Sequence, residues 1–177
     1  MQPIRCGEPA PVRSPVESKA ALGARARAAR GLVLAVPAAL LAGAYISEYG
    51  FGLYPCEMCW WQRYPHFAAL GFAALAFLTV PARLWIALAA VCLLISAGLG
   101  AFHAGVEYGW WPGLTSCARV VPSEPGGSAL EAIMNTPLVS CDQPQWTLAG
   151  ISLAGFNFLF SAAAGLAALV LLGKDRA

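Results

Sequence analysis

Residues 84–106 read LWIALAAVCLLISAGLGAFHAGV and contain no Asp, Glu, Lys or Arg. A helix needs about 20 apolar residues to cross the hydrocarbon core of a bilayer, so this stretch is long enough to span a membrane. Residues 81–83, Pro-Ala-Arg, leave room for only a tight turn between it and the apolar residues 64–80. The two stretches therefore predict a pair of antiparallel neighbouring helices.

The composition of the whole chain also indicates a membrane protein. Hydrophobic residues make up 59% of its 177 residues and charged residues only 11%, against roughly 45–50% and about 25% in soluble domains. So few charges cannot cover a soluble surface, which excludes an ordinary soluble domain and a disordered chain. The net charge of +2 is too small to suggest a nucleic-acid partner.

Two further apolar stretches complete the expected architecture. Residues 31–47, interrupted by Pro37, form a short first span, and residues 146–172 form the last one. We therefore expect an all-α fold, an integral membrane four-helix bundle over residues 31–172 with two exterior loops that carry cysteines. The segments outside the bundle are residues 1–30, expected to be a flexible cytoplasmic tail, and residues 173–177, expected to be a cytoplasmic C-terminus.

The distribution of basic residues predicts the orientation of the bundle. Nine of the eleven Lys and Arg residues lie in the tail, in the turn at residues 81–83 or at the C-terminus. Because Lys and Arg gather in cytoplasmic loops, both termini are predicted to be cytoplasmic, and residues 48–63 and 107–145 to be exterior. A cleavable signal peptide ending near Ala42-Gly43-Ala44 is the alternative for the first span, although a long tail before such a signal is unusual.

The predicted topology separates the six cysteines of the chain. Cys6 lies in the tail and Cys92 lies in the middle of a span, and neither is expected to react. The other four fall on the exterior side, where disulfides persist. These four are Cys56, Cys59, Cys117 and Cys141.

Cys56 and Cys59 have the spacing of a redox pair. The ring that a disulfide would close across Glu57 and Met58 is too small to restrain much chain, so a structural staple gains little there. One thiol can instead attack while its neighbour waits to resolve the intermediate. Cys59 also lies near a predicted helix start and near Arg63, and both would favour a thiolate.

The other exterior cysteines do not suggest a metal site. Zinc needs four converging ligands, and the second pair of cysteines lacks the Cys-x-x-Cys spacing that would supply two of them. No metal site is therefore predicted.

Two polar residues near the exterior boundary are candidates for binding a ligand. Arg63 follows Cys59 by four residues, one helical turn, and its guanidinium could polarise an oxygen-bearing redox ligand. The alternative is that Arg63 extends to lipid phosphates. His103 lies near the outer end of its span and either faces the same ligand or hydrogen-bonds to a neighbouring helix. His66 is expected to be structural.

The residues around these cysteines resemble the disulfide bond formation protein B (DsbB) family of quinone-dependent membrane thiol oxidases. Residues 55–63, PCEMCWWQR, are similar to the family's Cys-x-x-Cys-x-x-Gln-Arg segment. Residues 103–107 and the stretch from Cys141 to Asn157 are also similar. The resemblance covers about residues 31–172, and the order of the cysteines is its most specific part.

The resemblance implies a relay of disulfide exchange in a bacterial inner membrane. A reduced thioredoxin-like protein similar to DsbA would attack a Cys117–Cys141 disulfide through Cys117. Cys141 would then exchange with Cys56, freeing Cys59 as the thiolate that passes electrons to ubiquinone or menaquinone from the membrane pool. The residues implied to bind the quinone headgroup are Arg63, His103 and Gln62.

Two alternatives remain at this stage. A vitamin K epoxide reductase-like enzyme is also a four-helix thiol protein, but its loop cysteines come before the Cys-x-x-Cys pair, whereas here they come after it. A non-enzymatic membrane subunit with structural disulfides is the other. The chain carries no flavin or haem motif, so a lipid-soluble electron acceptor is the simplest one for an enzyme.

Overall fold

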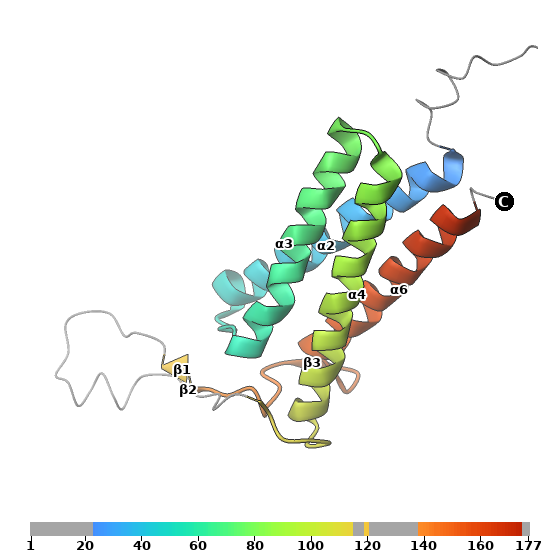
Figure 1. The fold of residues 1–177 in the computed structure, drawn as a ribbon. Coiled ribbons are helices and arrows are strands. Elements are labelled where there is room, and N and C mark those ends of the chain that lie inside the picture. Colours follow the sequence, from blue (N-terminus) through green and yellow to red (C-terminus); the bar gives the residue numbers. More distant parts are fainter. Residues whose placement is uncertain (1–22, 115–118, 121–137, 175–177) are drawn as a thin grey trace, which may run out of the picture.

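Four long helices make up most of the part of the chain that the computed structural model describes, residues 23–114, 119–120 and 138–174. They are α2 (Ala24–Phe51), α3 (Glu57–Leu78), α4 (Ala82–Glu107) and α6 (Leu153–Lys174). The strands are short and form two antiparallel pairs: β1 (Arg119–Val120) pairs with β2 (Leu138–Val139), and β3 (Thr147–Leu148) pairs with β4 (Ile151–Ser152). Figure 1 shows the helices packed as a bundle with the strands at one end.

Small residues let the helices approach closely. α4 packs against both α3 and α6, and α2 lies against α3 and α6. A Cβ added to Gly100 of α4 would lie 3.0 Å from the carbonyl oxygen of Ala154 in α6, and one added to Gly165 would lie 2.9 Å from the Leu94 side chain. Alanines supply much of the buried core: Ala26, Ala29, Ala69, Ala73, Ala76, Ala89, Ala90, Ala164 and Ala168. Such interfaces are typical of helices that associate inside a bilayer, where van der Waals packing replaces the hydrophobic effect.

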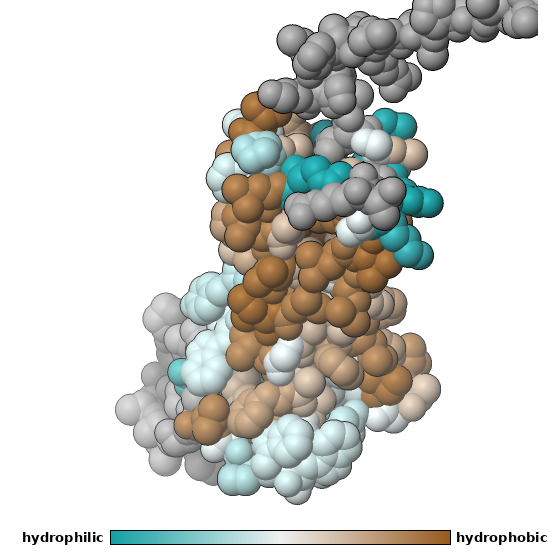
Figure 2. Space-filling view, turned by 45° about the vertical axis from the view of Figure 1, so that its right-hand side comes forward, coloured by the Kyte–Doolittle hydropathy of each residue, from teal (hydrophilic) through white to brown (hydrophobic). Residues whose placement is uncertain are grey.

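Three of these helices, α2, α4 and α6, are long and apolar enough to cross a membrane. α3 has 22 residues, but its first half carries polar side chains, among them buried Gln62, Arg63 and His66. Figure 2 shows a broad apolar band across the bundle, with a hydrophilic cluster at the end where α2 begins and α6 finishes. The surface is therefore that of a helical bundle suited to a bilayer.

Basic side chains hold that end of the bundle together. The start of α2, the turn between α3 and α4 and the end of α6 lie there together (Figure 1). A guanidinium N–H of Arg25 donates to the carbonyl oxygen of Lys174 at 2.9 Å, and Arg83 donates to a carbonyl in the last turn of α6. The guanidinium of Arg30 lies 4.0 Å from the centre of the Phe77 ring. Cations at this position also complement the negative end of the α6 dipole.

The first helix is longer than predicted. The expected span was residues 31–47, but α2 begins at Ala24, so residues 24–30 belong to a helix and not to a flexible tail. Alanine and arginine, which dominate these residues, are strong helix formers. The helix ends at Phe51 and is capped by Gly52, which has a left-handed φ of +69° and whose N–H bonds to the Ser47 carbonyl. Residues 1–22 lie outside the described part.

The last helix begins later than predicted. The expected span was residues 146–172, but α6 starts at Leu153 because β3 and β4 form a hairpin before it. The two connecting residues, Ala149 and Gly150, have φ values of +52° and +77°, the combination that suits a two-residue hairpin turn. The hydroxyl oxygen of Ser152 then accepts a backbone N–H in the first turn of α6 at 3.1 Å, as an N-cap does. α4 agrees with the predicted span over residues 84–106 to within a few residues. α3 overlaps the predicted span over residues 64–80 but begins earlier, at Glu57.

Candidate functional site

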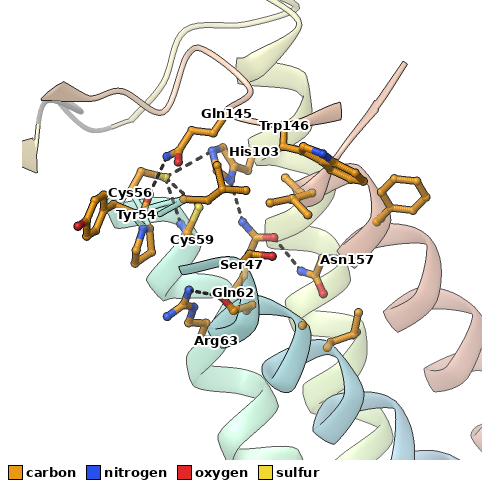
Figure 3. A pocket seen from close by; sticks show the side chains of 18 of the residues that line it. Ser47, Tyr54, Cys56, Cys59, Gln62, Arg63, His103, Gln145, Trp146 and Asn157 are labelled. Carbon is orange, nitrogen blue, oxygen red and sulfur yellow. Dashed lines mark hydrogen bonds between the residues drawn. The ribbon is translucent and has the colours of Figure 1, made fainter. Parts of the chain in front are cut away.

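A cavity of about 240 Å³ lies between α2, the first half of α3, the end of α4 and the start of α6. It lies in the half of the bundle away from the start of α2 and the end of α6. Most of its wall is apolar, and its reactive or charged lining residues are Cys56, Cys59, Arg63, His66, His103 and Glu107. Figure 3 shows Cys56, Cys59 and His103 together at one end of it, with Gln62 beneath them.

The first cysteine pair sits at the start of α3. Cys56 is the N-cap residue and is buried, with 2% of its surface exposed, whereas Cys59 is half-buried in the first turn. Their Sγ atoms lie 3.2 Å apart, and the Cys56 thiol donates to the Cys59 sulfur. The backbone N–H of Cys59 donates in turn to Cys56 Sγ at 3.4 Å. The helix start therefore brings the two sulfurs into position to form one disulfide.

The hydrogen bond between the two thiols makes them unequal. The pKa of Cys59 is lowered because its sulfur accepts the Cys56 S–H, which outweighs the effect of burial. The same bond, together with burial, raises the pKa of Cys56. Cys59 is thus the thiolate of the pair, as its place at a helix start predicted, but the group that stabilises it is Cys56 and not Arg63.

We expect iodoacetamide to alkylate Cys59 at a lower pH than an ordinary thiol. Because the thiolate is the nucleophile, the rate falls only as the pH drops through the pKa, which is lowered here. Cys56→Ala removes the donor and should move the profile of Cys59 to higher pH, whereas Cys56→Ser keeps a hydroxyl donor and should move it less. Mass spectrometry of the Cys59 peptide across pH measures both. Identical profiles in the alanine variant and the unmodified protein would contradict this assignment.

A third cysteine lies beside this pair. Cys141 lies two residues after the end of β2 and is buried. Its Sγ, the Sγ of Cys56 and a ring nitrogen of His103 all lie within 4.8 Å of one another. The Cys141 sulfur would therefore need to move only a short distance to exchange with the Cys56 sulfur. Two thiolates and an imidazole could also bind zinc, but a structural zinc site takes four ligands and the described residues bring three to this point.

The remaining cysteines have different positions. Cys117 and Cys6 lie outside the described residues, so the pairing of Cys117 with Cys141 stays a prediction. Cys92 lies in α4 and packs against the hydrophobic core. Its environment agrees with the expectation that it is a small apolar side chain.

Arg63 forms a buried ion pair with Glu48 of α2. Its Nη1 lies 2.6 Å from a carboxylate oxygen of Glu48, and the two side chains are only 7% and 12% exposed. The guanidinium also lies 4.9 Å from the ring centres of both Tyr45 and Trp60. Such burial does not match the alternative that Arg63 extends to lipid phosphates. It lines the cavity with its charge balanced by α2.

A polar network joins α3, α4 and α6 below the cysteines (Figure 3). The Gln62 amide nitrogen lies 2.8 Å from His103 Nδ1 and donates to the Met58 carbonyl at 3.2 Å. The Asn157 amide nitrogen donates to Gln62 Oε1 at 2.8 Å, and Asn157 Oδ1 lies 2.8 Å from His66 Nε2. Hydroxyl groups that complete the network are those of Ser96 and Ser161.

This network bears on two expectations from the sequence. Gln62 donates to the Met58 carbonyl, and its Oε1 accepts from Asn157, which leaves the second lone pair of Oε1 for a ligand that donates. His66 belongs to the network and also lines the cavity. Sequence reasoning missed Ser96 and the central role of Asn157. The signal for Asn157 was present, because it is an amide within an apolar helix, where polar side chains hydrogen-bond across helices.

Comparison with known proteins places this arrangement in a family. The family model described as "Disulfide bond formation protein DsbB" matches residues 26–171. This chain belongs to the DsbB family. Proteins named "Disulfide bond formation protein B" from Azoarcus sp. (strain BH72) and Verminephrobacter eiseniae are 37% and 34% identical to it. Both alignments cover 80% of this chain, and they cover 90% and 82% of those proteins. No solved structure matches the chain.

Membership of the DsbB family settles the broad class of the protein. With three helices apolar enough to span a membrane, it is a multi-pass bacterial membrane protein of disulfide bond formation. Its relatives indicate a thiol oxidoreductase. The vitamin K epoxide reductase-like alternative is set aside by the same match.

Proposed function

We propose that this DsbB-family protein oxidises a DsbA-like dithiol protein outside the cytoplasm and passes the electrons to a membrane quinone. The observation that carries the proposal is the position of Cys56. Its sulfur lies 3.2 Å from Cys59 Sγ, within 4.8 Å of Cys141 Sγ and at the wall of an apolar cavity. A sulfur so placed can exchange with one cysteine on the loop side and another on the cavity side.

Electrons enter at the second cysteine pair. A thiolate of the reduced partner attacks Cys117, the Cys117–Cys141 bond breaks, and its electron pair leaves on Cys141. The second thiolate of the partner resolves the mixed disulfide, so the partner departs oxidised and Cys117 becomes a thiol. Two electrons have then moved from the partner to Cys117 and Cys141.

Exchange with the first pair moves these electrons to the cavity. The Cys141 thiolate attacks Cys56, the Cys56–Cys59 bond breaks, and the electron pair leaves on Cys59. Cys117 then attacks Cys141, which restores their disulfide and releases Cys56 as a thiol. The lowered pKa of Cys59 suits it to leave first, since a thiol of lower pKa is the better leaving group.

The cavity wall fits a quinone headgroup. A flat ring with two carbonyl oxygens suits a mostly apolar space that holds a few polar groups. Arg63 would donate to one carbonyl oxygen. His66 is 3% exposed, and its Nδ1 has no hydrogen-bond partner among the described residues, so it would accept a hydroxyl of the reduced ring. When bound, ubiquinone or menaquinone accepts two electrons and two protons, while Cys56 and Cys59 return to a disulfide.

The proposed location is the bacterial inner membrane, with both termini in the cytoplasm. Arg25, Arg30, Arg83 and Lys174 lie at one end of the bundle, and the cysteine cluster lies at the other. Cytoplasmic loops are enriched in Lys and Arg, which supports this orientation. The cysteines would then face the periplasm, where disulfides persist.

The test is anaerobic mixing of purified protein with a reduced thioredoxin-like protein and a quinone. We expect one quinone reduced for each partner disulfide formed, because each process transfers two electrons. Quinone absorbance and thiol titration of the partner measure the two amounts. Cys92→Ser, which replaces a thiol packed against the core away from the cavity, is the matched control and should keep this activity. Quinone that stays oxidised would contradict the proposal.

A further inference from the structure

In the polar network beneath the cysteines, the hydrogen-bond partners determine which end of each side-chain amide is the NH2 group and which is the oxygen. A backbone carbonyl can only accept a hydrogen bond. The Gln62 amide group that faces the Met58 carbonyl at 3.2 Å is therefore its NH2. The Asn157 amide group that faces the Ser96 carbonyl at 3.2 Å is its NH2 for the same reason. The two assignments agree, because they also make Asn157 donate to Gln62 Oε1 at 2.8 Å.

These amide directions determine the tautomer of His103. The NH2 of Gln62 lies 2.8 Å from His103 Nδ1, and an NH2 group only donates. Nδ1 must therefore accept and carries no hydrogen. A neutral imidazole then holds its hydrogen on Nε2.

The protonated nitrogen of His103 faces the Cys56 sulfur. Nε2 lies 3.6 Å from Cys56 Sγ and 3.8 Å from a carboxylate oxygen of Glu107. Cys56 and His103 are both 2% exposed, so water reaches this sulfur poorly. A thiolate formed there needs a hydrogen-bond donor from the protein.

We propose that Gln62 is a positioning residue that holds His103 in the Nε2–H tautomer, so that His103 donates to the Cys56 sulfur when that sulfur leaves during disulfide exchange. Asn157 supports this by fixing the direction of the Gln62 amide. The catalytic part rests on the proposed function, whereas the tautomer follows from the network by itself. In the exchange, Cys117 attacks Cys141, the Cys56–Cys141 bond breaks, and the electron pair departs on Cys56. The hydrogen stays on His103 Nε2.

The tautomer can be observed directly. The chain contains only two histidines, so the full-length protein labelled with 15N-histidine gives signals from two rings, and His66→Asn assigns them. In the reduced protein we expect His103 Nδ1 to show the 15N shift of an unprotonated nitrogen and Nε2 that of a protonated one. A protonated Nδ1 on His103 would overturn the proposal, and this measurement needs no variant of Gln62.

A pair of variants then tests the functional role. Gln62→Leu should give His103 a mixture of tautomers and slow the release of Cys56 by about tenfold, the cost of losing a hydrogen bond to a charged group. Cys92→Ser is the control, since Cys92 lies on α4 and packs against the hydrophobic core. It should leave both the tautomer and the rate unchanged.

The rate is measured by mixing oxidised protein with a reduced partner without quinone, quenching with acid and counting the cysteines by mass. Failure of quinone reduction, which would overturn the proposed function, therefore does not affect this measurement. Gln62→Leu protein that keeps the Nε2–H signal and the normal exchange rate would overturn the positioning role.

Discussion

Cys59→Ser is expected to abolish quinone reduction, with turnover falling by at least about a thousandfold, as when an enzyme loses its nucleophile. Cys59 lines the cavity, and its sulfur accepts the Cys56 S–H. A serine hydroxyl neither forms a disulfide with Cys56 nor carries an electron pair to a quinone. The measurement is quinone absorbance under anaerobic turnover with a reduced partner. Turnover above a few per cent of the normal rate would contradict the role given to Cys59.

Combined with Cys117→Ser, the same substitution should also trap the exchange step. When Cys59 and Cys117 are both replaced by serine, Cys56 and Cys141 keep each other as neighbours, with sulfurs within 4.8 Å. Mild oxidation should then join them, because the two cysteines that resolve this disulfide in the relay, Cys59 and Cys117, are absent. Mass spectrometry of unreduced peptides would identify the Cys56–Cys141 pair. A folded double variant that links Cys56 to Cys92 or Cys6 instead would show that the relay does not pass through Cys141.

The helices were predictable from hydropathy because each lies within a long apolar stretch. The boundaries were less predictable, because hydropathy alone does not identify the residues that set them. Ala149 and Gly150 turn the chain between β3 and β4 inside a sequence that reads as a continuous apolar run from residue 146. In the other direction, α2 extends into arginine-rich residues, of which Arg25 donates to the Lys174 carbonyl at the end of α6. Both deviations depend on contacts that a hydropathy pattern does not contain.

The sequence likewise predicted the features of the site that depend on neighbouring residues, but not those that depend on contacts between distant segments. The spacing of Cys56 and Cys59 and their place at a helix start are local, so the sequence predicted a reactive pair and the more acidic thiol. The hydrogen bond from Asn157 to Gln62 and the position of Cys141 join distant segments and depend on how α3, α4 and α6 are rotated. No spacing rule indicates them. The pairing of Arg63 with Glu48 was hidden for the same reason, and it affects how Arg63 must be tested.

Replacing Arg63 alone confuses two effects. Arg63→Met should destabilise the protein by about 3–5 kcal/mol, because it leaves Glu48 as an unpaired charge in a buried position. A thermal melt would show this loss. Any fall in activity could then reflect partial unfolding as well as the loss of a ligand contact.

The double variant Glu48→Gln with Arg63→Met separates these effects, because it removes both buried charges. We expect it to regain most of the lost stability but to have a KM for quinone at least about tenfold higher, the effect of losing a charged hydrogen-bond donor. Disulfide exchange with the reduced partner, measured without quinone, should stay close to normal. Glu48→Gln alone keeps the guanidinium and should keep the KM. If the double variant bound quinone normally, Arg63 would serve only to neutralise Glu48, and the headgroup would have to be held by other residues of the cavity.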